Sequence, residues 1–417
     1  MPASRLLLAV VALGLIVSAC GGPAAAQEVR SDAPRSAANP AAALTLRDAT
    51  DAFAAELYKI VARKDGNVVL SPYSVAIALA MTRTGAAGET LKQMDTVLRG
   101  VAADQNAGFN ALDQALAKRP GKYRFGDQDL ELELATANRL WGQKDFTFER
   151  AFLDELAKDY GAGMQIVDYA NAHEAARRTI NDWVAARTRD RIKDLIAEGV
   201  LASDTRLVLT NAIYLKATWL LKFNDAVAGA FHRADGSVVQ AQLMSESEKL
   251  GYAKGAGYQA VRLAYAGGLS MVVIVPEAGT FGAFSQSLDG PTLRRVMSGL
   301  NTTQVNLAMP KFSFRSKAQL KDALSEMGMP IAFTDRADFS GITKQAPLEI
   351  ADVIHQAFIA VDEKGTEAAA ATAVVMRETS APLEVIQLTI DRPFLFVIQD
   401  DETGAILFMG RVTDPTA

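Results

Sequence analysis

The chain has 417 residues, of which 49% are hydrophobic and 22% charged, and its formal net charge is −5. This composition is typical of a soluble globular protein that is long enough to bury a large core. The net negative charge gives no reason to expect nucleic acid as a partner, and none is predicted.

The N-terminal segment has the pattern of an export signal. A positive charge precedes an apolar run over residues 6–16, and small residues then lead to Cys20, the only cysteine. The run is too short to cross a bilayer as a mature helix, but it suits a signal peptide. The placement of Cys20 resembles a bacterial lipobox, which implies a signal peptide over residues 1–19 and lipidation of Cys20. Cleavage near Ala26, which would release a free secreted protein, stays open.

Residues 20–45 are predicted to form a flexible tether between this anchor and the folded part. The segment is rich in Ala, Pro, Gly and Ser and has almost no large apolar residue, so it lacks the means to pack. Acyl chains on Cys20 would bind the membrane, and they leave no thiol for a disulfide. Gly21 after the cysteine favours the outer membrane by the same resemblance. We expect an exported protein, lipid-anchored to the cell envelope, periplasmic or surface-exposed, and extracellular if released.

The first half of the folded part is predicted to be mainly helical. Apolar residues recur at helical spacing from Leu46 to Ile60, and the pair Asp65-Gly66 ends this first helix. Residues 67–71 read as a short buried strand, and Pro72 suits the first turn of the next helix. Further helices are predicted over residues 106–117, 148–159 and 174–198.

The second half is predicted to be rich in strands. Residues 207–215 form a near-continuous apolar run, which is typical of a strand covered on both faces. Residues 260–263 and 269–275 flank two glycines and predict a hairpin. A short helix over residues 320–327 ends at a glycine, and two final strands are predicted at 394–399 and 405–412. No break in composition divides residues 46–417, so we predict one mixed α and β domain.

Enzyme chemistry finds no support in the sequence. There are only three histidines, His173, His232 and His355, and no Gly-x-Ser-x-Gly elbow presents a nucleophile. No His-Glu-x-x-His or cysteine pair offers a zinc site, and no glycine-rich phosphate loop follows a strand. We therefore predict a protein that is not an enzyme and that needs no metal or cofactor.

Residues 363–372, which read Glu-Lys-Gly-Thr-Glu-Ala-Ala-Ala-Ala-Thr, are the most informative segment of the chain. Alanine and glutamate favour helix, yet the segment lies between two apolar, strand-like stretches at 353–361 and 385–390. It is either a plain solvated loop or a segment that changes conformation. Gly365 would supply a permissive hinge for such a change.

This segment resembles the hinge of the reactive-centre loop of inhibitory serpins, and other segments match that family in its order. The matching segments are Asn67-Val-Val-Leu-Ser71-Pro72-Tyr-Ser74, Ala137-Asn138-Arg139-Leu140-Trp141, Ile180-Asn181-Asp182-Trp183-Val184, Thr210-Asn211-Ala212-Ile213-Tyr214, Met309-Pro310-Lys311-Phe312, Arg392-Pro393-Phe394-Leu395-Phe396 and Phe408-Met409-Gly410-Arg411-Val412. The resemblance covers residues 46–415. It implies an α+β fold with three β-sheets, about nine helices and an exposed reactive-centre loop, in a monomer.

The resemblance also implies a function and its mechanism. The scissile bond falls at Thr379-Ser380, and a serine endopeptidase, or a cysteine endopeptidase, would be trapped as an acyl-enzyme while the cut loop inserts into the central sheet. The inserting segment, residues 366–379, spans roughly 46 Å as a strand. Its inward phase begins with small or β-branched residues, and no charge or proline occurs in that phase before position 377.

The family pattern assigns roles to named residues. The loop hinge comprises Glu363, Gly365, Thr366, Glu367, Ala368, Ala369, Ala370, Ala371 and Thr372. A polar network where the sheet opens comprises Ser71, Ser74, Asn211 and His355. Trp219 and Lys311 match the region where the loop inserts, and Lys311 would form an ion pair with Glu363. A satisfied core histidine and an ordinary core tryptophan remain the plain alternatives for His355 and Trp219.

The target protease and the inhibitory activity itself stay open at this level. Thr379 suits an elastase-like or subtilisin-like protease, whereas cleavage at Arg377 would suit a trypsin-like one and shorten the inserted strand by two residues. A non-inhibitory serpin that is only a substrate or a binding protein is the main alternative, and an anchored scaffold is a third. The residues Ala217, Thr218 and Ala264 depart from common family choices near the site of insertion.

Overall fold

The computed structural model describes residues 27–99, 102–367 and 385–417. Of the expected site residues, Cys20, Ala368, Ala369, Ala370, Ala371, Thr372, Thr379 and Ser380 lie outside this description, as does the expected signal peptide. Within the described residues no helix is both long and apolar enough to span a membrane.

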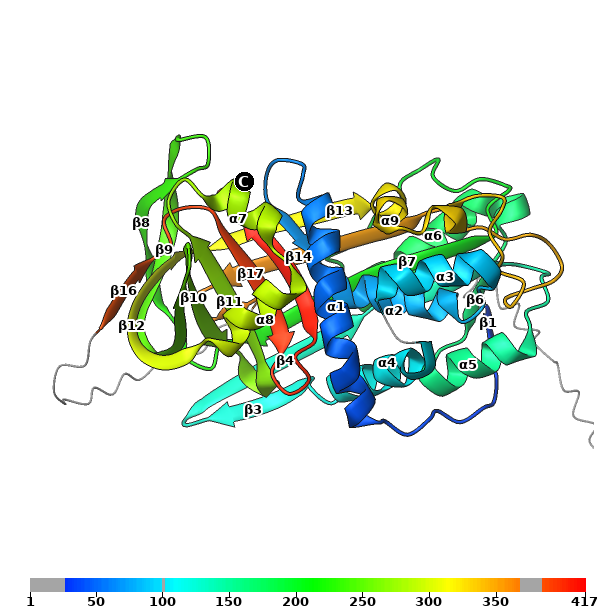
Figure 1. Ribbon diagram of the computed structural model, residues 1–417, viewed down its shortest axis with the longest axis horizontal. Coiled ribbons are helices and arrows are strands. Elements are labelled where there is room, and N and C mark those ends of the chain that lie inside the picture. Colours follow the sequence, from blue (N-terminus) through cyan, green and yellow to red (C-terminus); the bar gives the residue numbers. More distant parts are fainter. Residues whose placement is uncertain (1–26, 100–101, 368–384) are drawn as a thin grey trace, which may run out of the picture.

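The described residues form nine α-helices. These are α1 (Pro40–Val61), α2 (Pro72–Arg83), α3 (Gly88–Leu98), α4 (Ala102–Leu116), α5 (Arg150–Tyr160), α6 (Tyr169–Arg187), α7 (Phe281–Ser287), α8 (Gly290–Ser298) and α9 (Lys321–Met327). In Figure 1, α2 and α3 lie in front of strand β7, and α1 crosses between the helix-rich half and the half that carries β8 to β12.

The first of two nine-stranded sheets has the strand order β1-β6-β5-β7-β15-β14-β13, with β4 paired to β7 and β3 paired to β4. Its strands are β1 (Gln27–Val29), β3 (Gly121–Phe125), β4 (Gln128–Thr136), β5 (Arg139–Gln143), β6 (Met164–Val167), β7 (Leu207–Thr218), β13 (Phe312–Gln319), β14 (Val353–Asp362) and β15 (Gly365–Thr366). We call it the central sheet.

The second sheet has the order β16-β12-β9-β10-β11-β17-β18-β2, with β8 paired to β9. Its strands are β2 (Val68–Leu70), β8 (Asn224–His232), β9 (Val238–Gly255), β10 (Tyr258–Ala264), β11 (Leu269–Pro276), β12 (Asn301–Pro310), β16 (Ile386–Thr389), β17 (Phe394–Asp400) and β18 (Ile406–Val412). The predicted hairpin of β10 and β11 is confirmed by antiparallel pairing along both strands.

The mixed α and β fold is confirmed, but hydrogen bonding joins the described strands into two sheets where three were expected. The reason is β9, which is 18 residues long. Its residues 238–252 pair with β8 and β12, and its residues 251–255 pair with β10. One continuous strand therefore links the two smaller expected sheets into a single hydrogen-bonded one.

The N-terminal part differs from the expected tether from residue 27 onward. Strand β1 pairs antiparallel with β6, and α1 begins at Pro40, six residues before the expected start at Leu46. The side chain of Asn39 accepts a hydrogen bond from the N–H of Ala41 and caps the helix. Alanines of this first turn are buried, so small residues that looked too weak to pack fit a close contact instead.

Helix α6 ends earlier than predicted. It stops at Arg187, whereas the sequence predicted a helix to residue 198. Arg189 and Asp190 take positive φ angles of 51° and 59°, which the α-helix does not allow. The apolar residues beyond this point pack as an irregular segment, which periodicity alone does not distinguish from helix.

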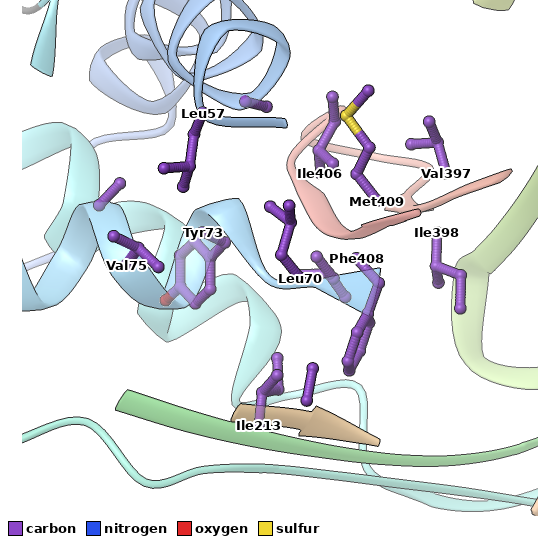
Figure 2. Close-up of a cluster of buried hydrophobic side chains, with 14 of the residues drawn as sticks. Leu57, Leu70, Tyr73, Val75, Ile213, Val397, Ile398, Ile406, Phe408 and Met409 are labelled. Carbon is purple, nitrogen blue, oxygen red and sulfur yellow. The ribbon is translucent and has the colours of Figure 1, made fainter. Parts of the chain in front are cut away.

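The core lies between the two sheets, and α2 runs through it. Every residue of α2 is buried, as expected for a helix that is covered on every side. Figure 2 shows the cluster at its N-terminal end, where Tyr73 and Val75 of α2 lie with Leu57 of α1, Ile213 of the central sheet and Phe408 of the second sheet. This packing fixes α2 directly beneath the strands that form the site described next.

Candidate functional site

The central sheet contains a gap between β7 and β14. The two strands pair in parallel from Val353↔Leu209 to Ala357↔Ile213. Four residues further along each strand they no longer pair with each other, because Thr366 of β15 lies between them and pairs with Ala217 on one side and Val361 on the other.

Strand β15 is the start of the expected hinge. After β14 the chain turns back on itself, and the Oδ1 of Asp362 accepts hydrogen bonds from the N–H groups of Lys364 and Gly365 at 2.8 and 3.2 Å. The N–H of Glu367 then donates to the carbonyl of Ala360 at 2.9 Å. The first hinge residues are therefore already a short third strand between β7 and β14.

Gly365 is needed at this turn. Its φ is +149°, and a Cβ added there would lie 2.0 Å from the carbonyl oxygen of Ala217. A side chain at this position would displace the short strand from the sheet. The glycine thus permits the reversal that brings the hinge into the gap.

An aromatic pair holds the next residue of the hinge. Thr366 is only 2% exposed, and its hydroxyl lies 2.6 Å from the hydroxyl of Tyr265. The ring of Tyr265 stacks on Trp219 with centroids 4.1 Å apart and an interplanar angle of 9°. The indole N–H of Trp219 donates to the carbonyl of Asp362 at 2.9 Å. Trp219 is therefore both a core residue and a direct contact of the turn.

Two ion pairs of hinge residues lie on either side of β15. The carboxylate of Glu363 accepts from Lys311 at 3.1 Å and from the N–H of Ala226 at 3.1 Å. Burial opposes ionisation of Glu363, but its hydrogen bonds outweigh burial and lower its pKa. Glu367 is paired with Arg191, and its φ of 55° ends the strand after Thr366. Burial is the main cause that raises the pKa of Glu367.

A buried polar network lies where β7 and β14 still pair. Asn211 and His355 are register partners, and the imidazole Nδ1 lies 2.6 Å from the Oδ1 of Asn211. The N–H of Ser71 donates to the Nε2 of His355 at 3.0 Å. Nε2 is thus an acceptor, so the imidazole is neutral and donates from Nδ1. Burial lowers the pKa of His355 to about 4.

The network extends into α2 and to Asn138, the residue that precedes β5. The hydroxyl of Ser71 caps α2 by accepting from the N–H of Ser74 at 3.2 Å, and the hydroxyl of Ser74 donates to the Oδ1 of Asn138 at 2.5 Å. The four residues expected at the sheet opening are therefore brought together. Their role in opening stays a prediction.

Sequence reasoning missed some functional contacts at this site. Tyr265 and Arg191 touch the hinge, but each lies far from it in the sequence, and no local signal marks them. Asn138 completes the polar network, and its place inside a matching family segment was an available signal. Lys216 was not missed, because the family pattern matches it, like Trp219, to the region where the loop inserts; it pairs with Glu131 and Glu133 on β4.

The described residues offer no group of three or more His, Cys, Asp or Glu side chains arranged to hold a metal ion. The arrangement can accept a further strand between β7 and β14. A strand that continued from Thr366 would run antiparallel between β7 and β14. It would have to separate the parallel pairing from residues 353 to 357, at the level of His355 and Asn211.

Comparison with known proteins gives a consistent result. A family model described as "Serpin (serine protease inhibitor)" matches residues 48–415. An uncharacterized serpin-like protein of Thermococcus kodakarensis is 37% identical over 377 residues, covering 88% of this chain and 85% of its own length. Serpin B4 of Homo sapiens is 34% identical over 389 residues, covering 89% of this chain and 100% of its own length.

Solved structures agree with this. The native state of the thermophilic serpin tengpin superposes with a TM-score of 0.81 at 26% identity, covering 93% of this chain and 97% of tengpin. Thyroxine-binding globulin in complex with thyroxine superposes with a TM-score of 0.77 at 26% identity, covering 89% of this chain and all of that one.

Proposed function

The chain belongs to the serpin family, and we propose that it is an inhibitory member, an irreversible suicide-substrate inhibitor of serine endopeptidases and, by extension, of cysteine endopeptidases. The observation that carries the proposal is β15. Its two residues, Gly365 and Thr366, pair with β7 on one side and with β14 on the other, as the first residues of an inserted strand would.

The sequence after β15 suits continued insertion. Thr366 is buried, and alternation along a strand places the residues at 368, 370 and 372 in the same inward phase. These are Ala, Ala and Thr, which bury little volume and no charge. An inserted strand would gain a hydrogen-bonded ladder on each side, whereas the five paired residues of β7 and β14 now share a single ladder.

The proposed chemistry follows the protease's own reaction. Its serine hydroxyl attacks the carbonyl of Thr379, the bond to the nitrogen of Ser380 breaks, and the amine leaves while an ester forms to the protease. Insertion of residues 366–379 then carries the ester across the domain. Catalytic geometry tolerates little displacement, so the ester is not hydrolysed. Thr379 favours an elastase-like or subtilisin-like target, and Arg377 leaves a trypsin-like one open.

The test is incubation of the protein with elastase, subtilisin and trypsin, followed by denaturing electrophoresis and mass spectrometry of the loop. We expect an SDS-resistant complex, and we expect the loop-cleaved protein to melt at a higher temperature than the intact one. Equal melting temperatures with no covalent adduct on any of the three proteases would reject the proposal.

A matched pair of variants tests insertion separately from cleavage. Thr366→Arg places a charge in the buried phase, where it has no partner, and should abolish the complex while the loop is still cut. Ala369→Arg places the same charge in the outward phase and should retain the complex. Equal inhibition by both variants would contradict insertion.

A binding function without inhibition is the second candidate, because one structure of the same fold is a complex of thyroxine-binding globulin with thyroxine. A non-inhibitory member would form no SDS-resistant complex and would gain no thermal stability when its loop is cut. The same electrophoresis and melting measurements therefore decide between the two.

We further propose that the protein is exported and anchored through lipidated Cys20, with the outer membrane favoured. The support is the apolar run over residues 6–16 followed by the chain's only cysteine. Metabolic labelling with a fatty acid should mark the wild-type protein and leave the Cys20→Ala variant unmarked. Labelling of the variant, or a mature N-terminus near Ala26, would favour a free secreted protein.

A further inference from the structure

A cavity of about 290 Å³ opens beside the second sheet, between β9, β10 and the connection that follows β7. Its wall combines hydrocarbon side chains with polar and charged ones, of which one is acidic and two are basic. The leucines of the wall are Leu220, Leu221, Leu250, Leu263 and Leu300, and the acid is Glu246.

Glu246 is an unusual residue for such a wall. It lies in the inward phase of β9, between the buried Met244 and Leu250, and it is 6% exposed. Neither of its carboxylate oxygens has a hydrogen-bond partner among the described residues. Buried polar groups are normally paired, and a buried, unpaired carboxylate is costly. Burial and the nearby Glu248 raise the pKa of Glu246 to about 8.

The other charged groups at the cavity do not neutralise Glu246. Arg262 lines the cavity, but its guanidinium is paired with Asp401 at 2.6 Å. Lys249 also lines the cavity and is exposed, and no ion pair joins it to Glu246 within the described part of the chain. The guanidinium of Arg262 is therefore already neutralised, and Glu246 is the acidic side chain that a cation entering the cavity would meet.

We propose that this cavity is a binding site for a small amphipathic amine, whose ammonium group pairs with Glu246 and whose hydrocarbon body packs against the leucines. The ammonium supplies the hydrogen-bond donors that the carboxylate lacks. The leucines bury the apolar remainder, which an inorganic cation would leave unfilled. The site is independent of the inhibitory proposal, because its occupancy can be measured with no protease present.

The probe is hexylamine, and its matched controls are 1-hexanol, which keeps the chain and lacks the charge, and hexanoate, which inverts the charge. Binding to the full folded protein is measured by calorimetry and by ligand-observed NMR at pH 9, because the pKa of Glu246 is raised to about 8 and its carboxylate is ionised there. We expect saturable binding of hexylamine, with 1-hexanol weaker by about tenfold or more and hexanoate not bound. Equal binding of hexylamine and 1-hexanol, or no saturable binding of hexylamine, would overturn the proposal.

Two variants on the same strand locate the contact. Glu246→Gln keeps the shape and removes the charge, and it should weaken hexylamine by about tenfold or more. Ser247→Ala changes an exposed, uncharged residue that does not line the cavity and should leave the affinity unchanged. Unchanged affinity in Glu246→Gln would refute the assigned contact. Thermal melting checks that both variants fold, and the ligand series on the unmutated protein decides the question if Glu246→Gln does not.

Discussion

Protonation of His355 should destabilise the native fold in mildly acidic solution. In the folded protein Nε2 accepts a hydrogen bond from the N–H of Ser71 and Nδ1 donates to Asn211. A proton on Nε2 would point at the N–H of Ser71, so two hydrogen-bond donors would face each other in a fully buried position. Burial accordingly lowers the pKa of His355 from 6.5 to about 4.

The sign and size follow from linkage. Above pH 6.5 both folded and unfolded states hold His355 neutral, so its contribution to stability is fully present. As the pH falls from 6.5 to 4, the unfolded chain takes up a proton that the folded one does not, and the stability is lost. The lowered pKa corresponds to a loss of about 3 kcal/mol.

The assay is the denaturant midpoint of the first unfolding transition, measured from pH 7 to pH 4 for wild type, His355→Gln and His232→Gln. Other groups titrate in this window, since burial raises the pKa of Asp51 to about 7 and that of Glu246 to about 8. The difference between wild type and His355→Gln therefore isolates the histidine. The exposed His232 serves as control, and His232→Gln should follow wild type.

We expect the pH dependence to flatten in His355→Gln by about 3 kcal/mol across the window. The network lies where β7 and β14 must part, so acid should also speed loop insertion in the wild type. An equal pH dependence in wild type and His355→Gln would refute the assigned tautomer and its buried environment.

Three further predictions rest on single contacts. Gly365→Ala should expel β15 from the sheet, because the new Cβ would lie 2.0 Å from the carbonyl oxygen of Ala217; protease sensitivity of the hinge should rise, and unchanged sensitivity would argue against the inserted hinge. Tyr265→Phe removes the hydroxyl 2.6 Å from Thr366 and should cost about 1 kcal/mol of native stability, measured by denaturant unfolding. Arg119→Met leaves the buried Asp400 without the guanidinium that lies 2.6 Å away and should lower the free energy of unfolding by about 3–5 kcal/mol. Arg63→Met, at the exposed pair with Glu326, should lower it by less than about 1 kcal/mol. Equal losses in the two variants would contradict the argument from burial.

The local sequence pattern was sufficient to predict most of the helices and strands. The apolar run at 207–215 became the doubly covered strand β7, the paired glycines after Ala264 became the turn between β10 and β11, and Pro72 stands in the first turn of α2. These predictions succeed because side-chain periodicity and turn chemistry act over a few residues.

The site was only partly accessible from sequence. Motif resemblance brought Ser71, Asn211 and His355 to attention, but not the tautomer that their contacts impose. Neither Tyr265 nor Arg191 carries a local signal, because each meets the hinge only through the pairing of distant strands.

The amino-acid sequence by itself determined the family, the mixed fold and the composition of a hinge that suits burial in a sheet. Only the tertiary structure decided that residues 27–39 pack on the domain, that β9 joins two expected sheets, and that Gly365 and Thr366 already stand between β7 and β14. Periodicity records which face of an element is apolar, whereas strand pairing and the burial of Glu246 depend on contacts between residues that are far apart in the chain.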